Sequence, residues 1–453
     1  MSRALELAER ALRAAEGDEA LALVQREVSG LARFAGSEVH QPTLIDNEVV
    51  ELQIVRDGRL GLASANRTDD DGLRALAARA AEAADNAPAD PDFPGLAPRA
   101  EPPAVEGYDE ATAALPPEEQ ARLAAAAIEA SSLDLYGFFT SGLTELALAS
   151  TTGLSVSQSM TDTGVLALAA VDGASGYAEQ TSWRVGELDP AAVAREAVAK
   201  AERTRGAAVL EPGTYAAVLE PYAFAELLLY FGYDAFSGLG VLEERSFAVG
   251  RLGEKVFDER FGLADDPLDP RGLPKAFDFE GTPKRRVELV ENGVLTGVLW
   301  DRRTAKLAPG GQETTASAPQ SRLRHWGPLP SALSVAGGEA ESTEELAGLV
   351  GDGIYVTRLH YLSIVSPRDG VITGMTRDGT FRIRDGGVAE PLVNLRFTVS
   401  VPELLAELHG LTREPVLVNE SSFYDERYPS GLLVPGVATA RFDVTGTGSG
   451  PGV

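Results

Sequence analysis

Residues 221–240 read PYAFAELLLYFGYDAFSGLG, and the rest of the chain can be placed around this stretch. Its apolar residues recur at helical spacing, so one helix face is expected to pack into a core; these residues are Phe224, Leu227, Leu228, Phe231 and Ala235. Farther along, residues 277–307 alternate apolar and polar side chains on either side of Glu291-Asn292-Gly293. Because Asn-Gly favours a tight turn, this region is predicted to form a β-hairpin.

The chain before this stretch mixes helices with antiparallel strands. Helical patterns cover residues 3–16, 69–84, 116–130 and 189–205, and strand patterns cover residues 20–28, 48–54, 60–65, 135–139, 145–150, 154–160, 164–171 and 176–182. Residues 86–106 are rich in Pro, Ala and Asp and are predicted to form a surface loop. This order predicts an α+β domain over residues 1–208, with the boundary at the break after the fourth helix.

Residues 209–453 form the second predicted domain, which is rich in strands. Residues 306–321 are predicted to be a long polar loop, and loops of that length are often functional. Helices are expected over residues 342–350 and 401–408. Strands are expected over residues 354–364, 414–418 and 439–444, with two more between residues 375 and 392.

Composition favours some classes of function over others. The chain of 453 residues has a net charge of −28 and no cysteine. Nucleic-acid binding needs a concentrated basic face, and no basic cluster exceeds Lys284-Arg285-Arg286 or the two arginines of Arg322-Leu323-Arg324. No run approaches the roughly 18 apolar residues of a membrane-spanning helix, and the N-terminus lacks the apolar core of a signal peptide. We therefore expect a cytoplasmic protein with neither nucleic acid nor membrane as a partner.

A family resemblance appears in an ordered set of short motifs. They are Arg245-Ser246-Phe247, Gly253-Glu254-Lys255-Val256, Asp278-Phe279-Glu280-Gly281, Glu291-Asn292-Gly293-Val294, residues 370–381 (GVITGMTRDGTF) and Asn394-Leu395-Arg396-Phe397. In this order and spacing, from about residue 210 to the end, the chain resembles the TldD/PmbA family, which has also been described as modulators of DNA gyrase. The resemblance implies two domains: an N-terminal helix and antiparallel-sheet domain, and a strand-rich, barrel-like C-terminal domain.

The family's catalytic subunit carries a His-Glu-x-x-x-His helix and a C-terminal Cys. That spacing puts two imidazoles on one helix face, where they can share a zinc ion. The matching positions here are Tyr233, Asp234 and Gly238, and the chain has no Cys. The resemblance therefore implies a TldE/PmbA-type subunit with no catalytic residues, no metal ligands and no cofactor of its own, whose partner subunit holds the zinc.

The resemblance points to two pairs of candidate substrate-binding residues, and a charged and aromatic loop segment supplies a further candidate. His360 and Tyr361 are expected near the inner face of the C-terminal domain, although a half-buried histidine with a satisfied hydrogen bond is the more common case. Arg377 and Asp378 lie in the most family-specific segment, although such pairs usually stabilise turns. His325 belongs to Arg322-Leu323-Arg324-His325-Trp326, which would either bind a peptide carboxylate or brace its loop. No two of His40, His325, His360 and His409 are three to five residues apart, so no local metal pair exists.

The predicted function is that of the metal-free subunit of a zinc metallopeptidase complex that cleaves or processes unfolded peptides. The partner would be a zinc-bearing homologue in a heterodimer, or a second copy of this chain. The main alternative is a non-catalytic, self-associating protein that binds peptides or regulates another protein. A remote third alternative is an enzyme with different chemistry at Asp234, His360 or Asp378.

Overall fold

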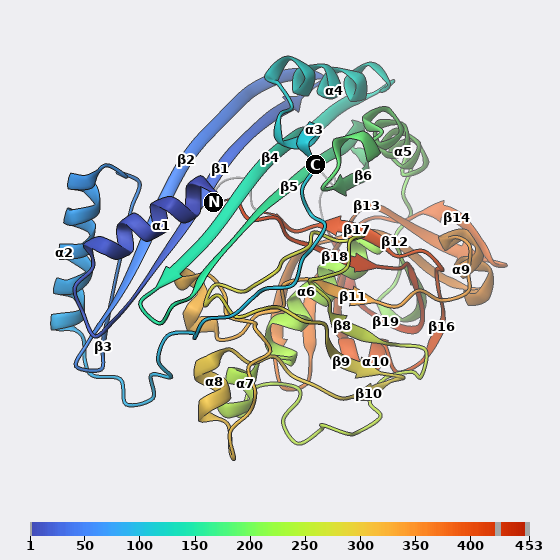
Figure 1. Ribbon diagram of the computed structural model, residues 1–453. Helices are drawn as coiled ribbons and strands as arrows, with labels where there is room; N and C mark the ends of the chain where they lie inside the picture. Colours follow the sequence, from blue (N-terminus) through green and yellow to red (C-terminus); the bar gives the residue numbers. More distant parts are fainter. Residues whose placement is uncertain (1, 422–426, 449–453) are drawn as a thin grey trace.

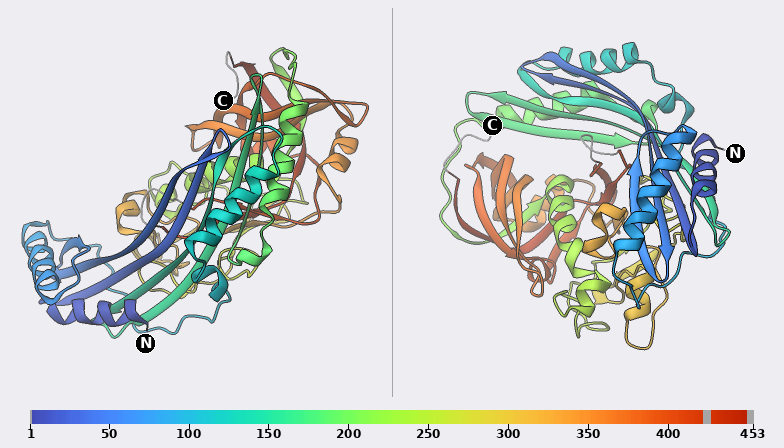
Figure 2. Two further views of the ribbon diagram at one scale, coloured as in Figure 1. Left: turned by 90° about the horizontal axis from the view of Figure 1, so that it is seen from above. Right: turned by 90° about the vertical axis from the view of Figure 1, so that its left-hand side faces the viewer.

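Six antiparallel strands form the N-terminal sheet, in the order β3-β2-β1-β4-β5-β6 (Figure 1). The computed structural model describes residues 2–421 and 427–448. The strands are β1 (Glu19–Ala35), β2 (Glu38–Arg56), β3 (Arg59–Ala65), β4 (Asp134–Ser150), β5 (Ser155–Val171) and β6 (Ala174–Ser182). The sheet curves over the C-terminal domain, as the two views of Figure 2 show.

Helices cover the outer face of this sheet. They are α1 (Arg3–Ala14), α2 (Asp70–Asn86), α3 (Glu110–Ala113), α4 (Pro117–Glu129), the short 3₁₀ turn η1 (Val185–Glu187) and α5 (Pro190–Arg203). Because successive strand residues point to opposite faces, Ala22 and Val24 of β1 pack against α1 and α2. Their neighbours Leu21 and Leu23 pack instead against Phe277 of the C-terminal domain. Both faces of the sheet are thus buried, and the second one holds the two domains together.

β4 and β5 are each continuous over 17 residues, although the sequence predicted two shorter strands in place of each. The predicted breaks fell at residues 140–144 and 161–163, next to Gly142 and Gly164. In the structure Gly142 lies within the ladder, where a Cβ atom would come within 2.8 Å of the Arg427 side chain. The glycine therefore makes room for a buried arginine and does not end the strand.

Five strands of the C-terminal domain close into a barrel. Their order is β12-β7-β19-β15-β13, and β12 also pairs with β13. The bounds are β7 (Gly213–Leu219), β12 (Gly353–Ser366), β13 (Val371–Arg384), β15 (Leu395–Ser400) and β19 (Val437–Thr447), with β14 (Gly387–Pro391) and β16 (Leu408–Leu411) attached at its edge. The α+β class and the barrel-like C-terminal domain are both confirmed.

A second six-stranded sheet lies beside the barrel. Its order is β10-β9-β8-β11-β18-β17, with bounds β8 (Leu263–Asp265), β9 (Val287–Glu291), β10 (Val294–Leu295), β11 (Leu333–Val335), β17 (Val416–Asn419) and β18 (Gly431–Val434). The predicted hairpin is the β9–β10 pair, in which Asn292 and Gly293 take the positive φ values of its turn. The remaining helices are α7 (Gly238–Leu242), α8 (Arg302–Leu307), the 3₁₀ turn η2 (Ser321–Trp326), α9 (Thr343–Val350) and α10 (Val401–Leu404). The helix predicted over residues 401–408 is too long, since β16 begins at Leu408.

The helix α6 (Pro221–Ala235) is the centre of the C-terminal domain, as its sequence predicts. Phe224, Leu227, Leu228 and Phe231 are at most 3% exposed and belong to the largest apolar cluster of the molecule. At roughly 1.5–3 kcal/mol for each fully buried side chain, this face is a principal source of the domain's stability. No helix in the described part of the chain combines the length and the apolar character needed to cross a bilayer.

Candidate functional site

Two pockets share Phe279: the larger is lined by residues of both the N-terminal sheet and the C-terminal domain, and the smaller by residues of the C-terminal domain. The larger has a volume of about 410 Å³ and the smaller of about 240 Å³, and Phe279 lines both. Ligand sites commonly occur where two domains meet, so this junction is the candidate functional site.

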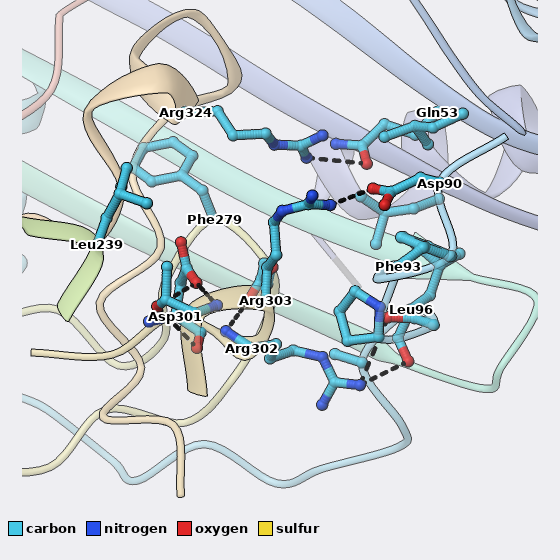
Figure 3. A pocket seen from close by; sticks show the side chains of 18 of the residues that line it. Gln53, Asp90, Phe93, Leu96, Leu239, Phe279, Asp301, Arg302, Arg303 and Arg324 are labelled. Atoms are coloured by element: carbon cyan, nitrogen blue, oxygen red, sulfur yellow. Dashed lines mark hydrogen bonds and ion pairs between the residues drawn. The ribbon is translucent and has the colours of Figure 1, made fainter. Parts of the chain in front are cut away.

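The larger pocket has an apolar wall on each side and arginines between them. Figure 3 shows Leu239 and Phe279 on one side and Phe93 and Leu96 on the other. Phe93 and Leu96 come from the Pro-rich segment over residues 86–106, which has little regular structure, as predicted, and lines this pocket. The arginines are Arg302 and Arg303 at the start of α8 and Arg324 from η2.

Two carboxyl groups line the same pocket near α8. Asp301 caps α8, and its Oδ1 accepts hydrogen bonds of 2.7 Å from the Thr304 N–H and from the Thr304 hydroxyl. Glu280 accepts one from the Arg302 N–H at 3.2 Å. Burial, and then the neighbouring charges of Asp278 and Asp301, raise the pKa of Glu280 to about 8, so this carboxyl is mainly protonated at neutral pH.

The smaller pocket contains Tyr233, Glu420 and Tyr428. The Tyr428 ring lies against Phe279, with 4.9 Å between the ring centroids. Lys284 also lines this pocket, and its ammonium donates to the Ala316 carbonyl at 2.7 Å. Aromatic and charged groups thus lie together beside the C-terminal end of α6.

The sequence resemblance aligns Tyr233, Asp234 and Gly238 with the zinc motif, and their surroundings can now be described. Tyr233 presents a phenol, and Asp234 is 8% exposed and accepts a hydrogen bond of 2.5 Å from Arg245. A Cβ atom at Gly238 would lie 2.3 Å from the Trp300 ring and 2.6 Å from the Leu299 carbonyl oxygen. A histidine side chain therefore cannot be accommodated at position 238 unless the Trp300 ring and the Leu299 backbone move. Within residues 2–421 and 427–448, no three His, Asp or Glu side chains are grouped closely enough to hold a metal ion.

Polar residues form a stripe along the otherwise apolar α6. They are spaced at i, i+4, i+8 and i+11, which places them on one helix face: Tyr222, Glu226, Tyr230 and Tyr233. Burial raises the pKa of Glu226 to about 7. Burial and the nearby carboxylates of Glu179 and Glu226 also raise the pKa of Glu420 well above its usual value. We call Glu179, Glu226 and Glu420 the acidic cluster.

Arg358 of β12 lies against the acidic cluster. Its guanidinium is 4.1 Å from the centre of the Tyr177 ring and donates to Asp378 at 3.0 Å. The charge of Arg358 opposes the rise in pKa at Glu179, Glu226 and Glu420. The cluster is thus one buried network that joins β6, α6 and β12.

The structure separates the predicted substrate-binding residues into two groups. His325 lines the larger pocket. His360, Arg377 and Asp378 lie around Arg358 instead, where burial and the two arginines lower the pKa of His360. Asp378 is buried and accepts a hydrogen bond of 2.7 Å from Ser175 of β6, so it joins the barrel to the N-terminal sheet.

Tyr361 lies in a bulge of β12 and is the most exposed of the predicted residues. Its φ angle is 52° and 76% of it is accessible, while its ring stacks on His360 with 3.9 Å between the centroids. An exposed aromatic residue on a bulged strand suits a contact surface better than a catalytic role.

Sequence reasoning missed Glu280, Arg302 and the acidic cluster. Their contacts join segments that are far apart in the sequence, such as Arg302 with Leu96, and no local pattern reveals them. The polar stripe on α6 was the available signal, because it places Glu226 and three tyrosines on one face of a helix that is otherwise almost entirely apolar.

Three sequence profiles of one family match the chain. The PmbA/TldA metallopeptidase domain 1 matches residues 20–84, the central domain residues 110–205 and the C-terminal domain residues 212–446. The C-terminal match alone covers more than half of the 453 residues.

Curated relatives match over shorter stretches. A metalloprotease of Methanothermobacter thermautotrophicus is 31% identical over 176 residues, which is 38% of this chain and 37% of that protein. A metalloprotease of Archaeoglobus fulgidus is 41% identical over 70 residues, or 16% of each chain. The chain thus aligns with less than half the length of these relatives.

Solved structures match over nearly the whole length. TldE from Thermococcus kodakarensis superposes with a TM-score of 0.85 at 20% identity, covering 97% of this chain and 99% of that one. A Thermotoga maritima protein described as a modulator of a DNA gyrase superposes with a TM-score of 0.83 at 19% identity, with the same coverage. Identities this low show a common fold. Together with the three profiles, they show that the chain belongs to the TldD/PmbA family of metallopeptidase-related proteins.

Proposed function

We propose that this chain is the metal-free subunit of a two-subunit zinc metallopeptidase that cleaves or processes unfolded peptides. The observation that carries the proposal is Gly238, which packs against Trp300 where the catalytic subunit of the family has a zinc-binding histidine. The fold that the chain shares with TldE supports the same assignment.

In this proposal the chain shapes and closes a chamber around the peptide. An unfolded peptide would lie extended along a strand edge, where main-chain hydrogen bonds give affinity with little sequence preference. Zinc and the hydrolytic step belong to the partner subunit. The heterodimer, the cytoplasmic location and the lack of a nucleic-acid partner stay predictions from the sequence.

A mixing experiment tests the proposal. An unfolded, fluorescently labelled peptide is incubated with this chain, with a family member that carries His-Glu-x-x-x-His, and with both. We expect rapid cleavage only in the mixture, with a rate that saturates at equal amounts of the two chains. Cleavage by this chain alone would contradict the proposal. So would a cleavage rate of the zinc-bearing homologue that stays the same when this chain is added. If the mixture binds peptide without cleaving it, the self-associating, non-catalytic alternative is favoured.

A further inference from the structure

Two interfaces of different character join the N-terminal sheet to the C-terminal domain. In the first, which we call the apolar interface, Leu21 and Leu23 pack against Phe277. The second lies at β6, the last strand of the sheet, which runs close to β13 and β17 (Figure 1). We call it the polar interface, because the contacts that cross it are hydrogen bonds, ion pairs and a cation–π contact.

The polar interface is built around β6 and the start of α6. The Glu179 carboxyl accepts a hydrogen bond of 3.0 Å from the Asn419 N–H, and the Glu179 carbonyl accepts one of 3.1 Å from the Tyr222 hydroxyl. Lys200 of α5 donates to the Glu220 carboxylate at 2.7 Å. Water can form the same bonds in an open state, so each of these contacts adds little net stability. The polar interface is therefore easier to open than the apolar one.

Carboxyl groups outnumber the cations of the polar interface. Lys200 pairs with Glu220, and Arg358 pairs with Asp378. Arg377 is also directed at Asp378, at 3.7 Å. Within residues 2–421 and 427–448, no cation lies at ion-pair distance from any member of the acidic cluster. The three carboxyls of the cluster thus have only the more distant charge of Arg358 to offset their own.

This shortage of cations favours the protonated form of the cluster. A buried carboxylate without a paired cation is strongly unfavourable, and burial raises the pKa of all three members, that of Glu226 to about 7. The charged and titratable groups that face Glu226 and Glu420 come from β6, α6, β12 and β13. They are Glu179, Tyr230, Tyr233, Arg358 and Asp378.

We propose that the polar interface is a proton-controlled switch, which is closed while the acidic cluster is protonated and opens when Glu226 and Glu420 ionise. The new charges repel each other and require water, which enters when β6 separates from α6 and β17. The apolar interface and Arg427 stay in place and act as the hinge. Because the closed state binds the protons more tightly, it is favoured at low pH and weakens as the pH rises through 7. The switch lies within one chain and is independent of the proposed function.

The distance between two spin labels measures the opening. The chain has no cysteine, so labels can be attached to Ala199→Cys on α5 and Glu344→Cys on α9, which are exposed positions in the two domains (Figure 1). We expect one distance at pH 5.5 and a second, longer distance at pH 8.5. The same single distance at both pH values overturns the proposal. Labels at Ala199→Cys and Glu118→Cys, both in the N-terminal domain, should give one distance throughout, and a second distance there would also overturn it.

Substitutions assign the response to the acidic cluster. A chain with both Glu226→Gln and Glu420→Gln should keep the single distance at pH 8.5, because the amide has the shape of the protonated carboxyl and cannot ionise. The matched control carries Glu259→Gln and Glu313→Gln, whose parent side chains are 76% and 85% exposed, and it should retain the second distance. A second distance that persists without the carboxyls of Glu226 and Glu420 contradicts the assignment.

Hydrogen exchange locates the opening in the unlabelled chain. The N–H groups of Glu179 and Asn419 donate across the polar interface, to the Tyr222 hydroxyl and the Glu179 carboxyl. After correction for the effect of pH on intrinsic exchange, both should lose protection at pH 8.5, while Leu21 and Leu23 keep theirs. Loss of protection at both interfaces would show a general loosening of the fold and overturn the switch.

Discussion

Single residues decide whether this chain can hold a metal. Gly238 donates its N–H to the Leu299 carbonyl at 2.9 Å, and its missing side chain lets Trp300 pack against the backbone. Asp234 is held by Arg245 and so is not directed at a shared metal site. The packing around Gly238 therefore leaves no room for a larger side chain at this position.

The contact at Gly238 is testable by mutation. We expect Gly238→Ala to lower the free energy of unfolding by about 1–3 kcal/mol, because the new methyl group overlaps Trp300 and a backbone carbonyl. Gly348→Ala is the control, since Gly348 lies in α9 with no atom within 4 Å of its Cβ position. That variant should be more stable than the parent by about 0.5–1 kcal/mol. Urea unfolding measures both, and equal stability of the two variants would rule out the close packing described here.

At the scale of elements, the sequence predicts α6 and the β9–β10 hairpin well. The apolar period of α6 and the Asn292-Gly293 turn each involve residues that are close together in the sequence, so both can be recognised without knowing the tertiary contacts. β4 and β5 were each predicted as two shorter strands, whereas both are continuous over 17 residues. Here Gly142 accommodates Arg427, a contact between residues that are far apart in the sequence.

The polar stripe on α6 makes stability depend on pH. Glu226 has a pKa of about 7 in the folded chain, well above its ordinary value of 4.5. The folded state thus binds this proton more tightly than the unfolded state. The stabilisation from binding this proton is fully present below pH 4.5 and is lost as the pH rises through 7.

We therefore expect Glu226→Gln to raise the free energy of unfolding by about 3 kcal/mol at pH 8 and to change it little at pH 4. Glu202→Gln on the exposed face of α5 is the control and should have no such effect. Chemical denaturation at both pH values measures the difference. An equal effect of Glu226→Gln at the two pH values would show that the carboxyl is not buried as described.

At the scale of the whole molecule, Arg427 fastens the C-terminal domain to the N-terminal sheet. Its guanidinium is fully buried and donates two hydrogen bonds of 2.8 Å to Asp162 of β5 and one of 2.9 Å to Thr140 of β4. Gln25 of β1 donates to the Arg427 carbonyl at 2.7 Å. The larger pocket lies between the same two domains, so its shape depends on how they are held together.

Breaking that contact should destabilise the chain strongly. Arg427→Met leaves Asp162 buried without its cation, and we expect a loss of about 3–5 kcal/mol in the free energy of unfolding. Arg441→Met removes the ion pairs of an exposed arginine with Glu403 and Asp443 and should cost no more than about 1 kcal/mol. Denaturant unfolding compares the two variants, and a loss at Arg427 as small as that at Arg441 would mean that the domains are held together by other contacts.

The candidate site shows where prediction from sequence ends. His325 was identified because charge and aromatic residues occur together in one short segment. Glu280 and Arg302 were not, because Glu280 stands out by its burial and Arg302 by contacts that depend on the Pro-rich segment folding back across α8. The composition of residues 86–106 predicted a loop, but it did not indicate that this loop would contact α8.

Zinc analysis tests the central claim most directly. The chain is purified alone and together with a homologue that carries His-Glu-x-x-x-His, and the zinc content of each preparation is measured by mass spectrometry. The account predicts no stoichiometric zinc in the chain alone and one zinc for each pair, retained in the pair when Tyr233 and Asp234 of this chain are replaced by Ala. Stoichiometric zinc bound to this chain alone, and lost from it on those replacements, would contradict the account.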